Sequence, residues 1–91
     1  MLKIKVHNKF KKDLKLMKKR GYDEEKLWAV VDKLAAGVPL PPKNRDHALT
    51  GNYLGSRECH IEPDWLLVYE IWNDELLLVL IRTGTHSDLD F

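Results

Sequence analysis

The first residues of the chain alternate between apolar and basic side chains. Leu2, Ile4 and Val6 are apolar, and the lysines between them would point the other way. A period of two is typical of a β-strand with one face in water. The pattern therefore predicts that a strand covers residues 1–6.

Two segments with helical periodicity follow. In the first, Phe10, Leu14 and Met17 recur at the spacing of one helix face, and lysines fill most other positions. We expect Asn8 to cap this helix and Gly21 to end it.

The second helical segment begins almost at once. Asp23 is placed to cap it, and two glutamates follow in the first turn, where the helix dipole favours negative charge. Gly37 and Pro39 end it. Its apolar stripe consists of Leu27, Val30, Val31 and Leu34. Two short helices joined by a short link predict an antiparallel helical hairpin.

The second half of the chain has the pattern of three consecutive strands, after a proline-rich loop at 38–47. Pro63 and Asp64 separate the first two strands, and a turn at Asn73-Asp74 separates the last two. The third strand is apolar on both faces, as central strands are. The three are expected at 56–62, 65–72 and 75–82.

The resulting order, β-α-α-β-β-β, predicts one α+β domain over residues 1–91. The helical hairpin would pack on one face of a mainly antiparallel four-stranded sheet. The other face would then be free to form a concave working surface.

Charge is distributed unevenly along the chain. Nine of the fifteen Lys and Arg residues lie between Lys3 and Arg20, against a single acid, Asp13. Such a segment suits a polyanion or an acidic protein, and a merely solvated helix face has the same composition. One cysteine, no signal-like segment and no long apolar run favour a cytoplasmic protein without a membrane anchor.

The densest group of reactive side chains is R-E-C-H-I-E-P-D-W at 57–65. Strand alternation places Cys59 and Ile61 towards the core, and His60 and Glu62 on the open face. A buried cysteine is inert, which counts against a thiol nucleophile. The four histidines lack the close spacing of metal ligands, so no metal is predicted.

Acid–base chemistry fits the remaining polar side chains better. Histidines and a carboxylate can act as general base and general acid, and an arginine can bind an anionic oxygen. RNA cleavage through the 2′-hydroxyl requires this set and no cofactor. Each histidine alone would be read as an ordinary surface residue. The candidate catalytic residues are His47, His60, Asp64, Arg82 and His86.

Several aromatic and basic side chains are candidates for substrate binding. Trp65 and Phe91 could stack on an unpaired base, although core packing is an equally good interpretation for Trp65. Trp28 and Trp72 are expected to pack against the core. Phosphate contacts are expected from lysines of the first helix, namely Lys11, Lys12 and Lys15.

Three separated motifs resemble those of the YafQ branch of the RelE toxin superfamily. The family patterns are K-D-H-x-L-x-G, R-x-x-H-x-x-P-D-W-[IL]-L-[IV]-Y and R-T-G-T-H-[SA]. They appear here as R-D-H-A-L-T-G (45–51), R-E-C-H-I-E-P-D-W-L-L-V-Y (57–69) and R-T-G-T-H-S (82–87). The resemblance covers the whole chain.

The resemblance implies a RelE-like fold and a bacterial toxin that cuts mRNA, usually in the ribosomal A site. It implies a DinJ-type antitoxin as partner, and operator DNA contacted only through that complex. By position it implies proton transfer by His86, shared acid–base and positioning roles for His47, His60 and Asp64, and transition-state stabilisation by Arg82.

The tail departs from the family pattern, which usually ends H-x-x-L-F. Here Asp90 stands where the family has its aromatic residue, and Phe91 follows one place later. In a helix one position is a rotation of about 100°.

Two other functions are compatible with the same residues. A non-catalytic operon co-repressor would bind the antitoxin tightly and be harmless when expressed alone. An RNA-binding module would show salt-dependent affinity for RNA without cleavage products.

Overall fold

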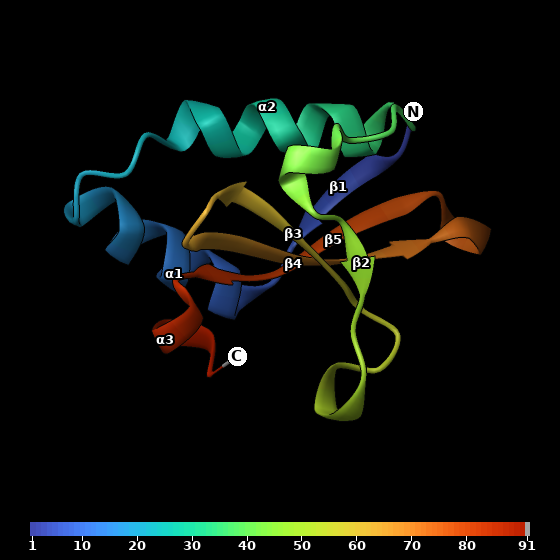
Figure 1. Cartoon of the computed structure of the whole chain (residues 1–91). Coiled ribbons are helices and arrows are strands. Elements are labelled where there is room, and N and C mark those ends of the chain that lie inside the picture. The colour runs from blue at the N-terminus through green and yellow to red at the C-terminus, as the bar shows by residue number, and fades with distance from the viewer. Residues whose placement is uncertain (91) are drawn as a thin grey trace.

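The computed structural model describes residues 1–90, so the predicted stacking role of Phe91 lies outside the described residues. Figure 1 shows helices arranged around a twisted sheet. The helices and strands are, in chain order, β1 (Lys3–Val6), α1 (Asn8–Lys19), α2 (Glu24–Ala35), β2 (His47–Ala48), β3 (Arg57–Glu62), β4 (Trp65–Trp72), β5 (Leu77–Gly84) and α3 (His86–Leu89).

The sheet has the strand order β1-β5-β4-β3-β2. β1 is parallel to β5, and the other neighbours are antiparallel. The predicted α+β class is confirmed, with a fifth strand in place of the expected four. The extra strand, His47–Ala48, was predicted as loop, because its pairing with Arg57 and Glu58 depends on contacts that a proline-rich sequence does not reveal.

The helix starts agree only partly with expectation. Asp23 caps α2, its Oδ1 accepting a hydrogen bond from the backbone N–H of Glu25 at 3.0 Å. His7 rather than Asn8 caps α1, because its Nδ1 accepts from the backbone N–H of Lys9 at 3.3 Å. The predicted cap therefore lies one residue too late.

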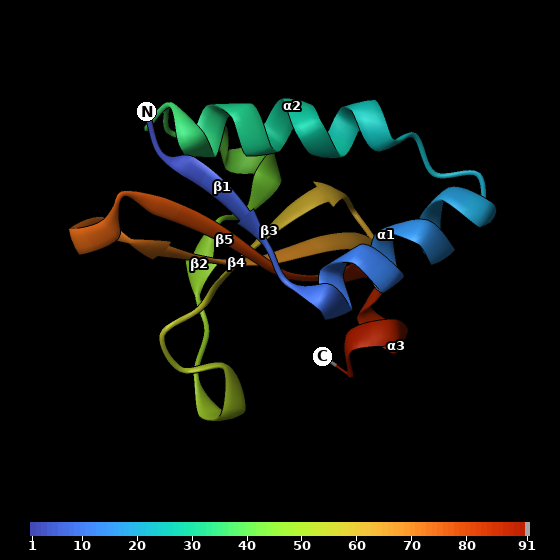
Figure 2. The ribbon, with the colours of Figure 1, turned by 180° about the vertical axis from the view of Figure 1, so that it is seen from behind.

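Helix α2 lies across one side of the sheet, and α3 lies on the opposite side (Figures 1 and 2). The main core is formed where α1 and α2 cover the sheet, and it includes Leu27, Val31, Cys59 and Leu67. Burial of Cys59 raises the pKa of its thiol to about 12, which agrees with the inert role predicted for it.

The opposite face of the sheet is only partly covered. A small cluster of Leu66, Val68 and Leu89 lies there, with Leu49 and Tyr53 packed against it. The face predicted to be free is therefore bordered by α3 and by the loop that contains the turn Gly51–Tyr53. A pocket lies between them, lined from both sides by residues that include Tyr53 and Leu89.

Two strand details differ from expectation. β5 begins two residues later than predicted, because Asn73–Glu75 forms a turn and Leu76 adopts a left-handed conformation with φ 53°. A β-bulge lies between His60 and Glu62.

The bulge breaks the alternation assumed for β3. Glu62, predicted on the open face, instead lies on the helical side, where its Oε2 is 3.4 Å from Nζ of Lys26 on α2. Among the described residues, no helix is long and apolar enough to cross a membrane.

Candidate active site

A cluster of two histidines and one glutamate occupies the open face where β2 and β3 pair. Nε2 of His47 lies 3.2 Å from Oε1 of Glu58, and Nε2 of His60 lies 3.4 Å from the same oxygen. Glu58 is buried, with an exposed fraction of 5%. Its carboxylate therefore links two of the predicted site histidines.

Glu58 is a functional candidate that was not predicted from the sequence. The alternation that placed His60 on the open face also places Glu58 there, two residues earlier. The alternation alone does not single out Glu58, because a glutamate at the start of a strand has the pattern of an ordinary surface residue.

His60 lies between two oxygen acceptors. Its Nδ1 is 3.3 Å from the carbonyl oxygen of Pro63, and its Nε2 faces Glu58. A carbonyl only accepts, so Nδ1–H donates to Pro63, and only the protonated ring can donate to both oxygens.

His86 and Asp64 form the second part of the site. Asp64 Oδ1 accepts a hydrogen bond from the backbone N–H of His86 at 3.0 Å and contacts its Nδ1 at 2.5 Å. The backbone hydrogen bond, followed by the side-chain one, lowers the pKa of Asp64. The ionised carboxylate can only accept, so Nδ1 of His86 donates to it, and Nε2 is the ring nitrogen left to meet a substrate.

The two parts of the site adjoin each other. The ring centroids of His60 and His86 are 5.6 Å apart, with an interplanar angle of 61°. Segments distant in sequence are brought together here, since α3 continues from the end of β5 while His60 lies on β3.

Arg82 supplies the positive charge of the site. It pairs with Val68 of β4, so it lies on the same face of the sheet as Glu58, which pairs with the same residue from the other side. Arg82 Nε donates to Oδ2 of Asp13 at 2.6 Å, and this bond is the main reason that the pKa of Arg82 is raised. Beside it is a pocket of about 390 Å³, lined by Asn52, Tyr53, Arg82, Asp88, Leu89 and Asp90.

The tryptophans agree only partly with their predicted roles. Trp65 is 0% exposed, and its Nε1 donates to Oγ1 of Thr83 at 2.9 Å. Base stacking by Trp65 is therefore contradicted, and core packing is correct. Trp72 was expected in the core but is 38% exposed, whereas Trp28 packs against the core as predicted.

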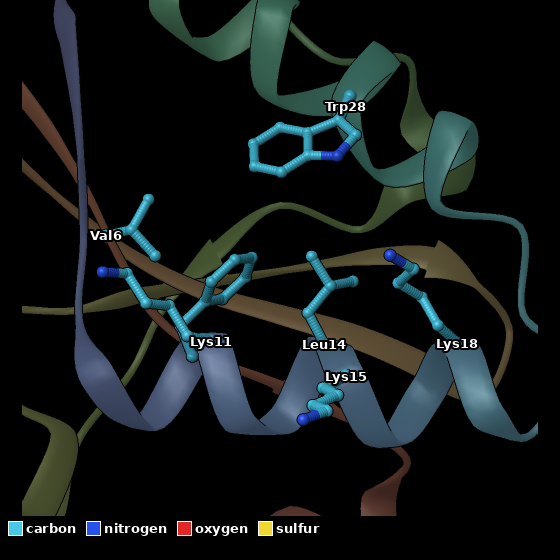
Figure 3. Close-up of a pocket in the computed structure, with 7 residues that line it drawn as sticks. Val6, Lys11, Leu14, Lys15, Lys18 and Trp28 are labelled. Carbon is cyan, nitrogen blue, oxygen red and sulfur yellow. The ribbon is translucent and has the colours of Figure 1, made fainter.

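The lysines of α1 do not join this group. Lys11 and Lys15 line a groove of about 300 Å³ between α1 and α2, together with Leu14, Lys18 and Trp28 (Figure 3). Lys11 and Asp13 are about 200° apart around the helix, so the groove and Arg82 lie on different sides of α1. Lys12 is exposed.

The cluster on β2 and β3 also has the composition of a metal site. Each of His47, Glu58 and His60 offers one ligand atom, and these three atoms lie within 4.8 Å of one another. Two imidazoles and a carboxylate suit zinc or copper. Histidine spacing offered no sign of this group, because strand pairing brings His47 beside Glu58 and His60.

Comparison with known proteins places these features in one family. A sequence model described as "Bacterial toxin of type II toxin-antitoxin system, YafQ" matches residues 2–90. The mRNA interferase toxin YafQ of Escherichia coli K12 is 40% identical over 87 residues, which cover 94% of this chain and 92% of that protein.

Solved structures agree with the sequence match. A metal-bound toxin from Helicobacter pylori is 49% identical, with a TM-score of 0.92 and coverage of 98% of this chain and 99% of that one. YafQ in the E. coli DinJ–YafQ complex is 39% identical, with a TM-score of 0.87 and 98% coverage of both chains. The chain described here therefore belongs to the YafQ family of bacterial toxins of type II toxin–antitoxin systems.

Proposed function

We propose that this protein is an endoribonuclease toxin that cleaves mRNA in association with the ribosome and so inhibits translation. One observation carries the proposal: His60, His86 and Arg82 share one open face of the sheet, and each has an acidic neighbour that orients it. The name of the E. coli relative, an mRNA interferase, supports this choice of substrate. Such a substrate implies a cytoplasmic location.

The proposed reaction is attack of the 2′-hydroxyl on the adjacent phosphate. One proton-transfer group takes the 2′-hydroxyl proton, and another protonates the leaving 5′-oxygen. We assign one of these transfers to Nε2 of His86 and the other to the cluster of His47, Glu58 and His60. Arg82 stabilises the charge that develops on the phosphoryl oxygens.

The lysines of α1 would act at longer range. Lys12 is placed on the exposed surface of α1, and its charge adds to the attraction of phosphates. No step of the proposed reaction requires a metal or another cofactor, because protein groups account for both proton transfers.

Primer extension on cellular mRNA after induced expression tests this proposal. The wild type should arrest growth and produce new 5′ ends, whereas His60→Ala and His86→Ala should produce few or none at equal protein levels. Asp74→Asn, a change in the distant turn before β5, is the matched control and should behave as wild type. Growth arrest without new 5′ ends would point to the binding-module alternative.

We also propose that an antitoxin of the DinJ type binds the groove between α1 and α2. Its apolar lining includes Phe10, Leu14 and Trp28, and lysines stand at its rim (Figure 3). An acidic helix with apolar anchors would complement both features. The complex with E. coli DinJ shows that a relative binds such a partner. Operator DNA would be contacted only through that complex.

A variant pair tests this groove. Leu14→Asp should weaken antitoxin binding measured by calorimetry, because it places a charge in the apolar lining. Ile4→Asp, a change at an apolar residue that is already exposed on β1, is the control. Equal affinities of both variants would place the antitoxin elsewhere.

A metal ion would act on this protein as an inhibitor. The H. pylori relative was solved as a metal-bound toxin, and this chain has a suitable group in His47, Glu58 and His60. An ion held there would take up the nitrogens that the proposed proton transfers need. Metal binding and catalysis would therefore compete.

A further inference from the structure

Helix α1 and its C-terminal cap residue, Arg20, provide two charged side chains that face the C-terminal part of the site. Asp13 and Arg20 are seven residues apart, so they project from nearly the same side of the helix. Asp13 is also the single acid in the otherwise basic segment from Lys3 to Arg20. Asp13 makes a paired contact with the end of β5, and Arg20 makes one with α3.

Asp13 binds Arg82 along one edge of its guanidinium group. Oδ2 accepts from Nε at 2.6 Å, and Oδ1 accepts from Nη2 at 3.1 Å. Oδ2 also accepts from the backbone N–H of Thr83 at 3.2 Å. Because the guanidinium is planar, this two-point contact fixes its orientation and directs its opposite edge away from Asp13.

The contact is largely removed from solvent. The side chain of Asp13 is 17% exposed and that of Arg82 is 24% exposed. Such a pair is less weakened by salt than a surface ion pair, and the two hydrogen bonds give it a defined geometry.

Arg20 makes an equivalent contact with α3. Its Nη1 donates to Oδ2 of Asp88 at 2.7 Å, and its Nη2 donates to Oδ1 at 3.2 Å. Asp88 also takes part in the capping box of α3, accepting from the backbone N–H of Thr85 at 3.0 Å. Since α3 begins with His86, Arg20 anchors the element that carries this histidine.

Gly84 brings α3 close to the end of β5. A Cβ at this position would lie 2.9 Å from Cβ of Asp88. The turn therefore has little room to shift, and its position is set by Gly84 on one side and Arg20 on the other.

We propose that Asp13 and Arg20 are positioning residues for RNA cleavage: Asp13 orients Arg82 towards the phosphate, and Arg20 holds His86 in place through Asp88. This inference rests on the proposed function. It assigns to α1 a role in catalysis that is separate from attraction of RNA by its lysines.

Single-turnover cleavage by purified variants tests the proposal. Asp13→Asn should lower the rate at saturating substrate by at least about tenfold while KM changes less than about twofold, because orientation rather than binding is lost. Arg20→Gln should show the same pattern. Asp74→Asn and Lys33→Gln, charge changes away from this contact, are the controls. Wild-type rates for Asp13→Asn would overturn the assignment.

Double variants separate the two routes. Asp13→Asn should have no further effect in an Arg82→Ala background, but its full effect should remain in a His86→Ala background. Arg20→Gln should show the reverse dependence. Additive effects in all four combinations would mean that the two residues act only through general stability, and the proposal would be wrong.

A measurement without RNA keeps the proposal testable if the wild type does not cleave. The Nε–H signal of Arg82 in NMR spectra should be shifted and protected from exchange in the wild type, and not in Asp13→Asn. If Asp13→Asn does not fold, Asp13→Glu is measured in its place. This variant keeps the charge but changes the geometry of the contact, so the Nε–H signal of Arg82 should differ from that of the wild type. Rapid exchange of this proton in the folded wild type would contradict the positioning role, independently of the proposed function.

Discussion

Asp64 receives two hydrogen bonds from His86, one from its backbone N–H and one from its ring. The contact joins the turn between β3 and β4 to the first residue of α3, across 22 positions of sequence. It orients the imidazole, and Nε2 is the nitrogen to which we assign the proposed proton transfer.

Replacing Asp64 by Asn should lower the cleavage rate without unfolding the protein. An amide can donate as well as accept, so the tautomer of His86 is no longer fixed. We expect a loss of about 10²-fold in kcat, within the range of general acid–base contributions. Stopped-flow cleavage of a short mRNA on ribosomes measures kcat. A pH–rate profile of Asp64→Asn that is the same as that of the wild type would be evidence against the contact.

The Arg20–Asp88 pair should make stability depend on acid pH. The hydrogen bond from Arg20, followed by that from Thr85, lowers the pKa of Asp88 from 3.8 to about 2. A depressed carboxyl pKa stabilises the fold above the unfolded value and loses this contribution as pH falls through the folded value. Between pH 4 and 2 the Tm of the wild type should therefore fall more steeply than that of Asp88→Asn. Parallel curves would argue against the pair.

Zinc should inhibit cleavage, and chelation should restore it. If the ion binds His47, Glu58 and His60, Glu58→Gln should bind it at least about tenfold more weakly, because a charged ligand is lost. Calorimetry with zinc chloride measures the affinity. His7→Gln, a change at a histidine outside the cluster, is the control, and equal weakening by both would place the ion elsewhere.

Trp65 should matter for stability and not for RNA binding. Trp65→Phe keeps most of the buried ring but leaves Oγ1 of Thr83 without its donor, at a cost of about 1–3 kcal/mol in the free energy of unfolding. Urea denaturation measures the loss. A change in RNA affinity at temperatures where the variant is folded would instead support stacking of Trp65 on an RNA base.

Much of the fold could be predicted from local patterns. The apolar alternation of β1, the stripe of α2 and the Asp23 cap depend on neighbours in sequence, and the structure contains all three. The inward orientation of Cys59 followed from the same alternation. These features are local, so a single chain reveals them.

The differences arise where contacts are distant in sequence. Glu62 changed face because a bulge inserts one residue into β3, and no local pattern marks it. Glu58 meets His47 of β2, and Asp13 meets Arg82 of β5, so the sequence alone did not show these contacts. The motifs located the histidines, Asp64 and Arg82, and the structure adds Glu58 and Asp13.

The claim that catalysis proceeds through the 2′-hydroxyl has one direct test. A ribosome-bound mRNA with a single 2′-deoxynucleotide at the cleavage position should resist the wild-type protein in EDTA, while the matched all-ribose mRNA is cut to a 5′-hydroxyl end. Cleavage of the deoxy-substituted mRNA at the same position and rate, or a 5′-phosphate on the product, would contradict the account.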